Sequence, residues 1–264
     1  MSEAEERLAR VARGWDAAAE GYDNYFVPRF APWVRTAVAG VGGASLPEGP
    51  ILVPCCGTFP ELDVLTEDFA EREIVGIDLA PAMVRRARER AAGRPRVGVV
   101  EGDATLPAAR WSGRCAAVVS VFGLQALAEP ELAMASWAAA LRPGGRLSVV
   151  FWPERTETDG PFALMSDVIR AHVPPGDRSW EGRLADVLAA RGAVIERDEY
   201  PAYRMSHADA PTFFDAFTRS GPLRVLAMER GDEFVARVRA EFLGRAPAGV
   251  WHHRPRARLI VARG

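Results

Sequence analysis

The chain has 264 residues, of which 48% are hydrophobic and 26% charged, and its formal net charge is −2 at pH 7. These values are typical of a globular protein with one large α/β domain or one domain and a cap. The near-neutral charge does not favour nucleic acid as a partner. No apolar run reaches the ~20 residues that span a bilayer, and we expect a cytoplasmic protein.

The N-terminal part of the chain is expected to be helical and rich in aromatic residues. Leu8, Val11 and Trp15 lie three or four residues apart, which predicts an amphipathic helix over residues 3–15. Residues 40–50 contain the glycine and proline residues that mark a loop. A new element is therefore expected to begin at about residue 50.

Strands and helices alternate from residue 50 onward, which predicts a doubly wound, mostly parallel sheet with helices on both faces. Thr58–Glu61 forms a capping-box pattern at the start of the first helix, and Pro81 opens the second. We expect strands at 50–54, 73–78, 96–101, 115–121 and 146–152, and helices at 59–69, 81–92 and 130–141.

The alternation loosens after residue 152. The segments 153–180 and 201–250 are expected to cap the carboxyl ends of the strands, because ligands bind at that edge in open α/β sheets. In this part of the chain we expect helices at 161–171, 184–191, 209–219 and 229–243, and strands at 193–200 and 256–262.

The turn after the first strand is the most informative stretch. Residues 51–54 form an apolar strand that enters a tight turn at Gly57, and Asp78 follows 21 residues later at the end of the second strand. This layout suits a ligand with a ribose, because the turn lets the backbone approach the ligand and the carboxylate accepts hydrogen bonds from sugar hydroxyls. A glycine-rich loop would have glycines at Cys55 and Phe59.

Four motifs in order carry a resemblance to a known family. The family is that of the class I S-adenosylmethionine-dependent methyltransferases. Its second motif resembles residues 75–83, and its third resembles residues 101–107. The strand beneath the methyl donor resembles residues 117–125, and the turn into strand five resembles residues 141–147. The resemblance is closest to the small bacterial enzymes of quinone and natural-product methylation. It covers residues 10–150 well and the rest in outline.

The resemblance implies a seven-stranded Rossmann-like sheet with S-adenosylmethionine as cofactor. Residues 1–45 would then form a helical lid, 46–152 the cofactor-binding core, and 153–264 the rest of the sheet with substrate-cap insertions. It also implies methyl transfer to a small molecule, in secondary metabolism or antibiotic biosynthesis, by a protein that is a possible homodimer.

The resemblance also assigns cofactor contacts. Asp78 would hold the ribose hydroxyls, although an aspartate that caps the following helix would look the same. Asp103 would read the adenine amino group, or else be an ordinary turn aspartate. Gln125 would contact the cofactor or cap a helix. The other expected contacts are Tyr22, Pro54, Cys55, Gly57, Phe59, Leu79, Met83, Ala104, Ser120, Val121 and Phe122.

The first motif departs from the family pattern. Val53 replaces the usual acidic residue, and Cys55 and Phe59 replace the outer glycines. A β-carbon at position 55 restricts positive φ angles and crowds the ligand. Either the cofactor is still held through backbone carbonyls, or the fold has been adapted to another use. The cysteine thiols are expected to be packed rather than reactive.

The aromatic stretch allows two interpretations. Tyr22 and Tyr25 would close over the cofactor as part of a mobile lid, with Gly14 and Gly21 as flexible points. Alternatively, the stretch is a helix packed on the edge of the sheet. Both interpretations can hold together.

The residues that are absent exclude several kinds of chemistry. All 33 basic residues are arginine, so there is no phosphate-binding, Schiff-base or general-base lysine. Cys55 and Cys56 are adjacent and Cys115 stands apart, which is not the spacing of zinc ligands. We expect neither a metal site nor a disulfide scaffold.

Alignment of the acceptor carries much of a methyl transfer, and a base helps if the acceptor is a hydroxyl. His172 and His207 are the first candidates for that base, before His252 and His253. Aromatic residues of the cap segments favour an apolar pocket for an aromatic or polycyclic acceptor, unless they simply form the core of the cap.

Three other functions stay open. A nicotinamide-dependent reductase is disfavoured by the missing Gly-x-Gly-x-x-Gly pattern. A non-methylating reaction on the same fold, such as cyclisation or decarboxylation, is compatible with the altered first motif. A protein that binds the cofactor without catalysis is the third.

Overall fold

The computed structural model describes residues 3–42, 45–107, 109–220 and 222–264. The chain divides into two compact units, each made of separate stretches of sequence. The sequence-based division into a lid (1–45), a cofactor-binding core (46–152) and a substrate-cap part (153–264) refers to functional roles, and it stays a prediction. We call Met1–Phe30, Glu154–Asp177 and Ala202–Arg256 the helical unit, and Ala31–Pro153, Arg178–Pro201 and Ala257–Gly264 the sheet unit.

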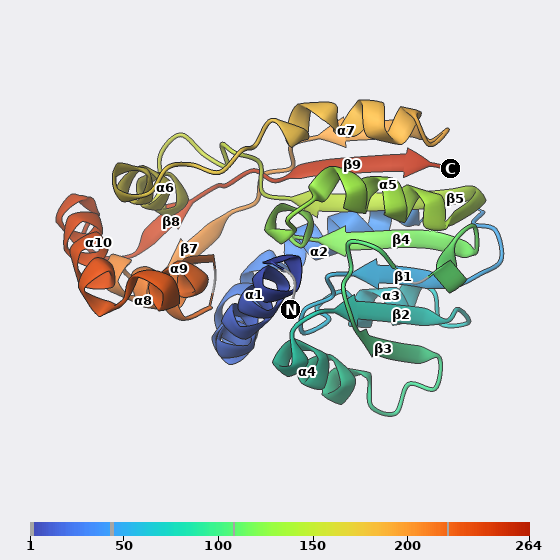
Figure 1. Cartoon of the computed structure of the whole chain (residues 1–264), viewed down its shortest axis with the longest axis horizontal. Helices are drawn as coiled ribbons and strands as arrows, with labels where there is room; N and C mark the ends of the chain where they lie inside the picture. Colours follow the sequence, from blue (N-terminus) through green and yellow to red (C-terminus); the bar gives the residue numbers. More distant parts are fainter. Residues whose placement is uncertain (1–2, 43–44, 108, 221) are drawn as a thin grey trace. The chain divides into compact units, whose positions relative to one another are not determined.

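The sheet unit contains a seven-stranded sheet of order β3-β2-β1-β4-β5-β9-β6 (Figure 1). Strands β1 to β5 run parallel, and β9 runs antiparallel to both of its neighbours. This arrangement confirms the predicted fold class. The strands are β1 Ile51–Pro54, β2 Ile74–Asp78, β3 Val97–Glu101, β4 Cys115–Val121, β5 Leu141–Phe151, β6 Val194–Glu199 and β9 Arg258–Arg263.

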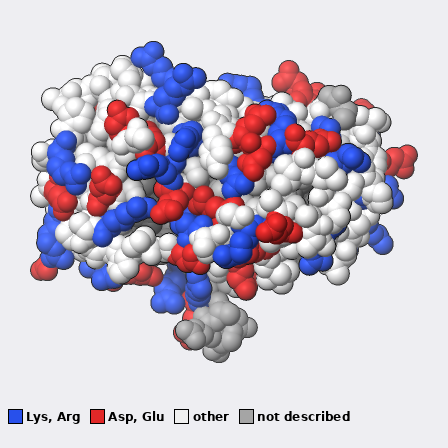
Figure 2. Space-filling model, turned by 90° about the horizontal axis from the view of Figure 1, so that it is seen from above, with Lys and Arg blue, Asp and Glu red and all other residues white. Residues whose placement is uncertain are grey.

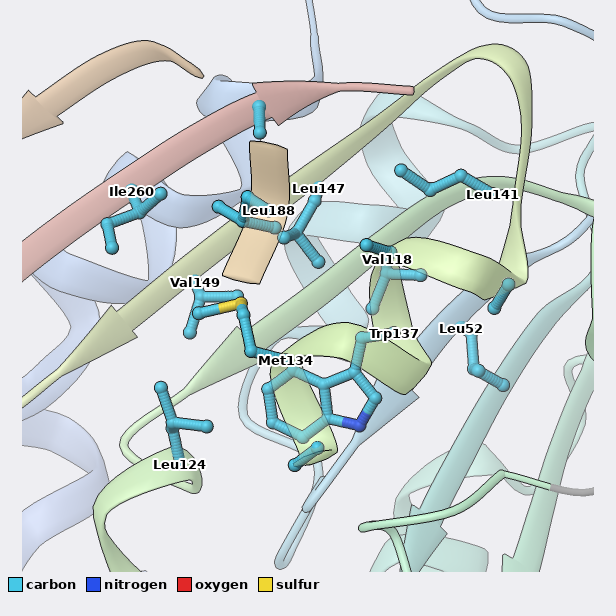
Figure 3. Packing of buried hydrophobic residues seen from close by; sticks show 14 of the residues in the cluster. Leu52, Val118, Leu124, Met134, Trp137, Leu141, Leu147, Val149, Leu188 and Ile260 are labelled. Atoms are coloured by element: carbon cyan, nitrogen blue, oxygen red, sulfur yellow. The ribbon is translucent and has the colours of Figure 1, made fainter. Parts of the chain in front are cut away.

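One face of the sheet is covered by α5 (Pro130–Ala140) and α7 (Trp180–Ala189). Their apolar side chains join those of the central strands in one cluster, because alternate residues of a strand point to the same face. Figure 3 shows how the indole of Trp137 and the side chains of Met134 and Leu188 lie against the strands.

The opposite face is covered by α2 (Val27–Val41). A Cβ on Gly40 would lie 2.5 Å from Ser148 Oγ and 2.9 Å from Val261 Cγ2, so the glycine allows the helix to approach the sheet closely. A helix in the aromatic stretch was one of the two interpretations of the sequence, but its bounds were not predicted.

Two crossover helices connect the first three strands. Helix α4 (Pro81–Ala91) begins at its proline as predicted, but α3 (Leu62–Asp68) begins three residues later than expected. The capping-box prediction is wrong, because Phe59 has a φ of 66°, which a helical residue cannot adopt. Short 3₁₀ turns lie at Ala109–Trp111 and Leu124–Ala126.

Strand β5 begins earlier than the predicted residue 146. Leu141 already pairs with Cys115, and the register shifts before Arg146 pairs with Ala117. Gly144 has a φ of 79°, which permits this irregularity within the strand. Residues 142–145 were expected to end the preceding helix, but they belong to β5.

The helical unit begins with α1 (Glu3–Gly21), which is longer than predicted and continues through a π-helical turn at Tyr22–Phe26. A Cβ on Gly14 would lie 2.4 Å from Val225 Cγ2, and one on Gly21 would lie 2.1 Å from Ser220 Oγ. Both glycines lie within a helix and permit close helix packing, so they are not the flexible points expected from the sequence.

Among its described residues, the rest of the helical unit consists of four helices and a small hairpin. Gly231, with a φ of 78°, divides the helix expected at 229–243 into α9 and α10, and the hairpin of three-residue strands was not predicted. The elements are α6 Pro161–His172, β7 Met205–His207, α8 Ala210–Ser220, α9 Pro222–Arg230, α10 Asp232–Arg245 and β8 Trp251–His253.

Aromatic residues of the helical unit form a packed core of their own. Phe213, Phe214 and Phe242 are fully buried together with apolar residues of α6 and α10. Trp180, which the sequence assigned to the cap, lies instead in α7 of the sheet unit, where it packs against Phe151. Of the two interpretations of the aromatic cap residues, the packed core fits Phe213 and Phe214.

Charges of both signs are interspersed on the surface that Figure 2 shows. In the part of the chain that the structure describes, no helix is long and apolar enough to cross a membrane. Within the same residues, no three histidine, cysteine, aspartate or glutamate side chains are grouped as metal ligands.

Candidate functional site

The turn between β1 and α3 has a left-handed backbone at three positions. The φ angles are 57° at Cys55, 53° at Gly57 and 66° at Phe59. A residue with a side chain costs about 1–2 kcal/mol in this conformation. The turn therefore keeps the shape of a glycine-rich loop although two of its expected glycines are replaced.

A glycine on β2 and another just after β4 make room for the two larger side chains. A Cβ on Gly123 would lie 2.3 Å from Cys55 Cβ, and one on Gly76 would lie 2.9 Å from the Phe59 ring. Phe59 is fully buried. The side chain of Phe59 therefore points into the core, and its expected cofactor contact stays a prediction that concerns its backbone.

Space is open at the middle of the turn. The nearest atom to a Cβ placed on Gly57 would be Met83 Sδ, at 4.0 Å. Met83 itself is buried in α4, and Leu79, between β2 and α4, is partly exposed. No described side chain crowds the backbone at Gly57, and its expected contact with the cofactor stays a prediction.

Asp78 ties this turn to the next strand. Its Oδ2 accepts a hydrogen bond of 2.8 Å from the Gly57 amide, and its Oδ1 accepts one of 3.0 Å from the Ala80 amide, just before α4. The Ala80 amide precedes the first residue of α4, so this bond does not by itself establish the interpretation as a helix cap, which stays a prediction. A role with ribose stays a prediction, and each carboxylate oxygen can accept more than one hydrogen bond.

The loop after β3 carries the second expected aspartate. Asp103 Oδ1 accepts a 2.8 Å hydrogen bond from the Thr105 amide, as an ordinary turn aspartate does. The buried Ala104 carbonyl accepts a 2.7 Å hydrogen bond from the Trp137 indole. The loop is therefore fixed to α5, while its role with adenine stays a prediction.

The end of β4 lies next to the turn. Ser120 Oγ donates to the Pro54 carbonyl at 2.9 Å, which links β4 to the end of β1. Phe122 has a φ of 57° and stacks on Trp152 with 4.1 Å between ring centroids. Val121 is buried beside them.

Gln125 closes the short helical turn after β4. Its Nε2 donates to the Phe122 carbonyl at 2.5 Å. Phe122 precedes the turn, so this bond is not a helix cap, and both expected roles of Gln125 stay predictions. Its buried Oε1 accepts no hydrogen bond from any described residue. Buried acceptors are normally satisfied, so a donor on a bound ligand would complete this site.

A buried acid lies beneath the turn. Burial raises the pKa of Glu61 to about 8, and Oε2 of its carboxyl group has no hydrogen-bond partner among the described residues. The sequence analysis treated Glu61 only as part of a capping box. Nothing in the sequence distinguishes a buried glutamate from a helix-capping one.

The thiols at the turn are protonated. Burial, and then the charge of Asp78, raise the pKa of both Cys55 and Cys56 well above its ordinary value. This agrees with the expectation that these cysteines are packed rather than nucleophilic.

These features lie at one edge of the sheet. The turn, Asp78, the loop after β3 and the end of β4 all follow the carboxyl ends of parallel strands, as Figure 1 shows. The order of strands reverses between β1 and β4, which is where open α/β sheets bind nucleotides. The left-handed turn, the open space at Gly57 and the unsatisfied Gln125 oxygen fit a nucleoside-containing cofactor.

The predicted bases lie in the helical unit. His172, at the end of α6, pairs with Glu241 at 2.9 Å. His207 is 1% exposed, and both of its ring nitrogens are engaged, by Tyr25 and His253. His207 therefore has no nitrogen left to contact a substrate directly.

The predicted lid residue Tyr22 also lies in the helical unit. Its ring contacts the rings of Trp15, Phe26 and Phe30. Its contact with cofactor stays a prediction.

Known proteins resemble this chain in sequence. A family model described as a methyltransferase domain matches residues 51–145. The demethylmenaquinone methyltransferase of Thermus thermophilus is 35% identical over 147 residues, which cover 54% of this chain and 63% of that protein. The chain spans 27% and 63% of the lengths of the curated relatives that it matches.

Solved structures resemble it in fold. A putative methyltransferase from Bacillus halodurans has a TM-score of 0.57 and 14% identity, and the match covers 87% of this chain and 97% of that one. The [4+2]-cyclase SpnF has a TM-score of 0.51 and 21% identity, over 87% of this chain and 80% of that one. At these identities the likeness establishes a shared fold.

Proposed function

We infer that this chain, which belongs to the class I S-adenosylmethionine-dependent methyltransferase family, transfers a methyl group from S-adenosylmethionine to a small molecule. The observation that carries the proposal is the turn after β1. Cys55, Gly57 and Phe59 keep a left-handed backbone there although only one of them is glycine. A left-handed backbone that is adopted at a cost in strain favours use of the turn as a cofactor site.

The residues of the sheet unit would hold the cofactor in distinct ways. Asp78 would accept hydrogen bonds from the ribose, Asp103 would bind the adenine amino group, and the Gln125 oxygen would accept a donor. When bound, the sulfonium supplies an electrophilic methyl group. The chain's own contribution would be to position the acceptor for an in-line attack and to remove its proton where needed.

An aromatic or polycyclic acceptor is the proposed substrate class. One relative is named for methylating demethylmenaquinone. The interspersed surface charge in Figure 2 offers little attraction to a phosphate backbone. The proposed reaction methylates an oxygen, nitrogen or carbon atom of the acceptor, in secondary metabolism or antibiotic biosynthesis. The protein is proposed to act in the cytoplasm and to be a possible homodimer.

A second candidate function is a non-methylating reaction such as cyclisation. The SpnF cyclase shares the fold. The loss of the motif acid at Val53 also removes a charge expected to hold the cofactor's ammonium group.

An assay for S-adenosylhomocysteine separates the two candidates. The protein is incubated with S-adenosylmethionine labelled in its methyl group and with a panel of phenols and quinols, and product and label are followed together. Methyl transfer predicts equal amounts of labelled acceptor and S-adenosylhomocysteine. Tight cofactor binding without either product would favour the second candidate.

A further inference from the structure

Val53, which stands where the family pattern has an acid, points away from α5 and α7. Its neighbour Leu52 belongs to the apolar cluster that packs under those two helices, and successive residues of a strand point to opposite faces. Val53 also pairs with Gly76 in the parallel register of β1 and β2. Residues paired in this way share a face of the sheet, so both positions lie on the side away from α5 and α7.

The turn after β1 folds back over this same face. A Cβ on Gly76 would lie 2.8 Å from Cys56 Sγ and 2.9 Å from the Phe59 ring, so both side chains cover β2 there. Glu61 follows two residues later and is only 1% exposed. Burial, the charge of Asp78 and the charge of Glu61 together raise the pKa of the Cys56 thiol. The Glu61 carboxyl group therefore lies beneath the turn, close to the thiol that covers Gly76.

Glu61 lacks a hydrogen-bond donor among the residues that the structure describes. Its buried Oε2 has no partner there. Burial raises its pKa to about 8, its own backbone amide and Arg90 of α4 oppose the rise, and Asp78 adds to it. A cationic donor would complete this group best, because it would supply a hydrogen bond and stabilise the ionised carboxylate at once.

The other two acids at this edge of the sheet are engaged in a different way. Asp78 accepts the amides of Gly57 and Ala80, and Asp103 accepts the amide of Thr105. Among the described residues, the buried carboxylate oxygen without a partner belongs to Glu61. Glu61 is therefore the acid that is best suited to receive a cation from a ligand in the turn.

We propose that Glu61 binds the ammonium group of S-adenosylmethionine and S-adenosylhomocysteine, in the role of the acid that is missing at Val53. The inference rests on the proposed function and assigns one more contact within that cofactor site. It moves the acid from the end of β1 to the start of α3, on the same face of the sheet. The altered first motif would then keep the charge that the ammonium group requires.

Formation of this ion pair is expected to release a proton. Glu61 carries its proton at pH 7, because its pKa is about 8. When the ammonium group pairs with the carboxylate, the O–H bond of Glu61 breaks and the proton passes to water. The charged and titratable groups that face Glu61 are Arg90 of α4, Asp78 at the end of β2, and the thiols of Cys55 and Cys56.

The sign of the pH dependence follows from this competition. Below about pH 8 the ligand must displace the proton from Glu61, so the affinity for S-adenosylhomocysteine is expected to rise about tenfold for each pH unit. Above that pH the carboxylate is already ionised, and the affinity is expected to level off.

The test compares two ligands that differ only in the ammonium group. Calorimetry at pH 8 measures the affinity for S-adenosylhomocysteine and for its deaminated analogue, in which hydrogen replaces that group. Glu61→Gln, which keeps the size and shape of the side chain, is expected to weaken S-adenosylhomocysteine at least about tenfold and to leave the analogue unchanged. Glu67→Gln removes an exposed carboxylate of α3 and is the matched control, with both affinities unchanged.

Proton release gives a second readout that a purely structural role would not produce. It is measured at pH 7 from the change in binding enthalpy among buffers with different enthalpies of ionisation. The wild-type protein and Glu67→Gln are expected to release about 0.9 proton with S-adenosylhomocysteine and none with the analogue, given a pKa of about 8. Glu61→Gln is expected to release none with either ligand.

Several results would overturn this role of Glu61. They are an equal affinity of wild-type protein and Glu61→Gln for S-adenosylhomocysteine, an equal weakening of both ligands by that substitution, or binding at pH 7 without proton release. Each of these results leaves the cofactor site in place and assigns a structural role to Glu61. A wild-type protein that binds neither ligand contradicts the proposed function itself.

Discussion

The amide of Gly57 donates a 2.8 Å hydrogen bond to Asp78 Oδ2, which joins the turn after β1 to the end of β2 across 21 residues of sequence. The same carboxylate accepts the Ala80 amide before α4. Asp78 therefore shapes the turn before any ligand binds. This contact, together with the glycines that face Cys55 and Phe59, explains how the turn persists without its usual glycines.

The strain at position 55 can be measured with substitutions. Cys55→Gly is expected to raise the free energy of unfolding by up to about 1 kcal/mol, because glycine adopts the left-handed conformation without cost. Cys55→Val is expected to lower it by more than about 1 kcal/mol, because a β-branched side chain fits this conformation poorly. Urea unfolding of the two variants measures both changes.

A double-mutant cycle in the same experiment tests the contact with Gly123. Gly123→Ala alone is expected to destabilise the protein, because its Cβ would lie 2.3 Å from Cys55 Cβ. The effect is expected to shrink when Cys55 is glycine. Equal losses in the two backgrounds would show that Gly123 and Cys55 do not press on each other.

Glu61 is expected to make stability depend on pH. Its pKa is raised from 4.5 to about 8 in the folded protein, so the folded state binds this proton more tightly than the unfolded state does. Its contribution to stability is complete below about pH 4.5 and is lost as the pH rises through about 8. Chemical unfolding across this range measures the slope.

Glu61→Gln is expected to remove that slope, because the amide does not titrate. Glu67→Gln, on the exposed side of α3, is the matched control and is expected to keep it. If the slope persists in Glu61→Gln, another group is responsible for it.

Much of the sheet unit could be predicted from the sequence because its signals are local. Apolar strands separated by helices define a parallel sheet, and Pro81 marks the start of α4 as predicted. The position of Asp78 after β2 places it near the turn because parallel strands end at the same edge. The fold class follows from such patterns.

The failures have long-range causes. Thr58–Glu61 satisfies a local capping pattern, but the tertiary packing of Phe59 forces a left-handed residue into it. The hairpin that brings His207 and His253 together is too short to leave a periodic signal. The contact between Glu157 and His253 could not be predicted, because the two residues lie 96 positions apart in the sequence.

The N-terminal segment offers a test of the predicted lid. Hydrogen exchange over residues 10–30 is expected to slow when S-adenosylhomocysteine is added, because a lid is ordered by the ligand that it covers. Exchange in α10 serves as an internal control and is expected to stay unchanged. Identical exchange with and without ligand would favour a helix that only packs within the helical unit.

The most direct test of the account is the affinity for S-adenosylhomocysteine, measured by calorimetry for the wild-type protein, Asp78→Ala and Asp63→Ala. Asp63 pairs with Arg94 on the exposed side of α3 and is the control. Loss of a charged hydrogen-bond partner costs about 1.5–3 kcal/mol, so Asp78→Ala is expected to weaken binding at least about tenfold while Asp63→Ala leaves it unchanged. Wild-type binding that is absent, or that Asp78→Ala does not weaken, would contradict the account.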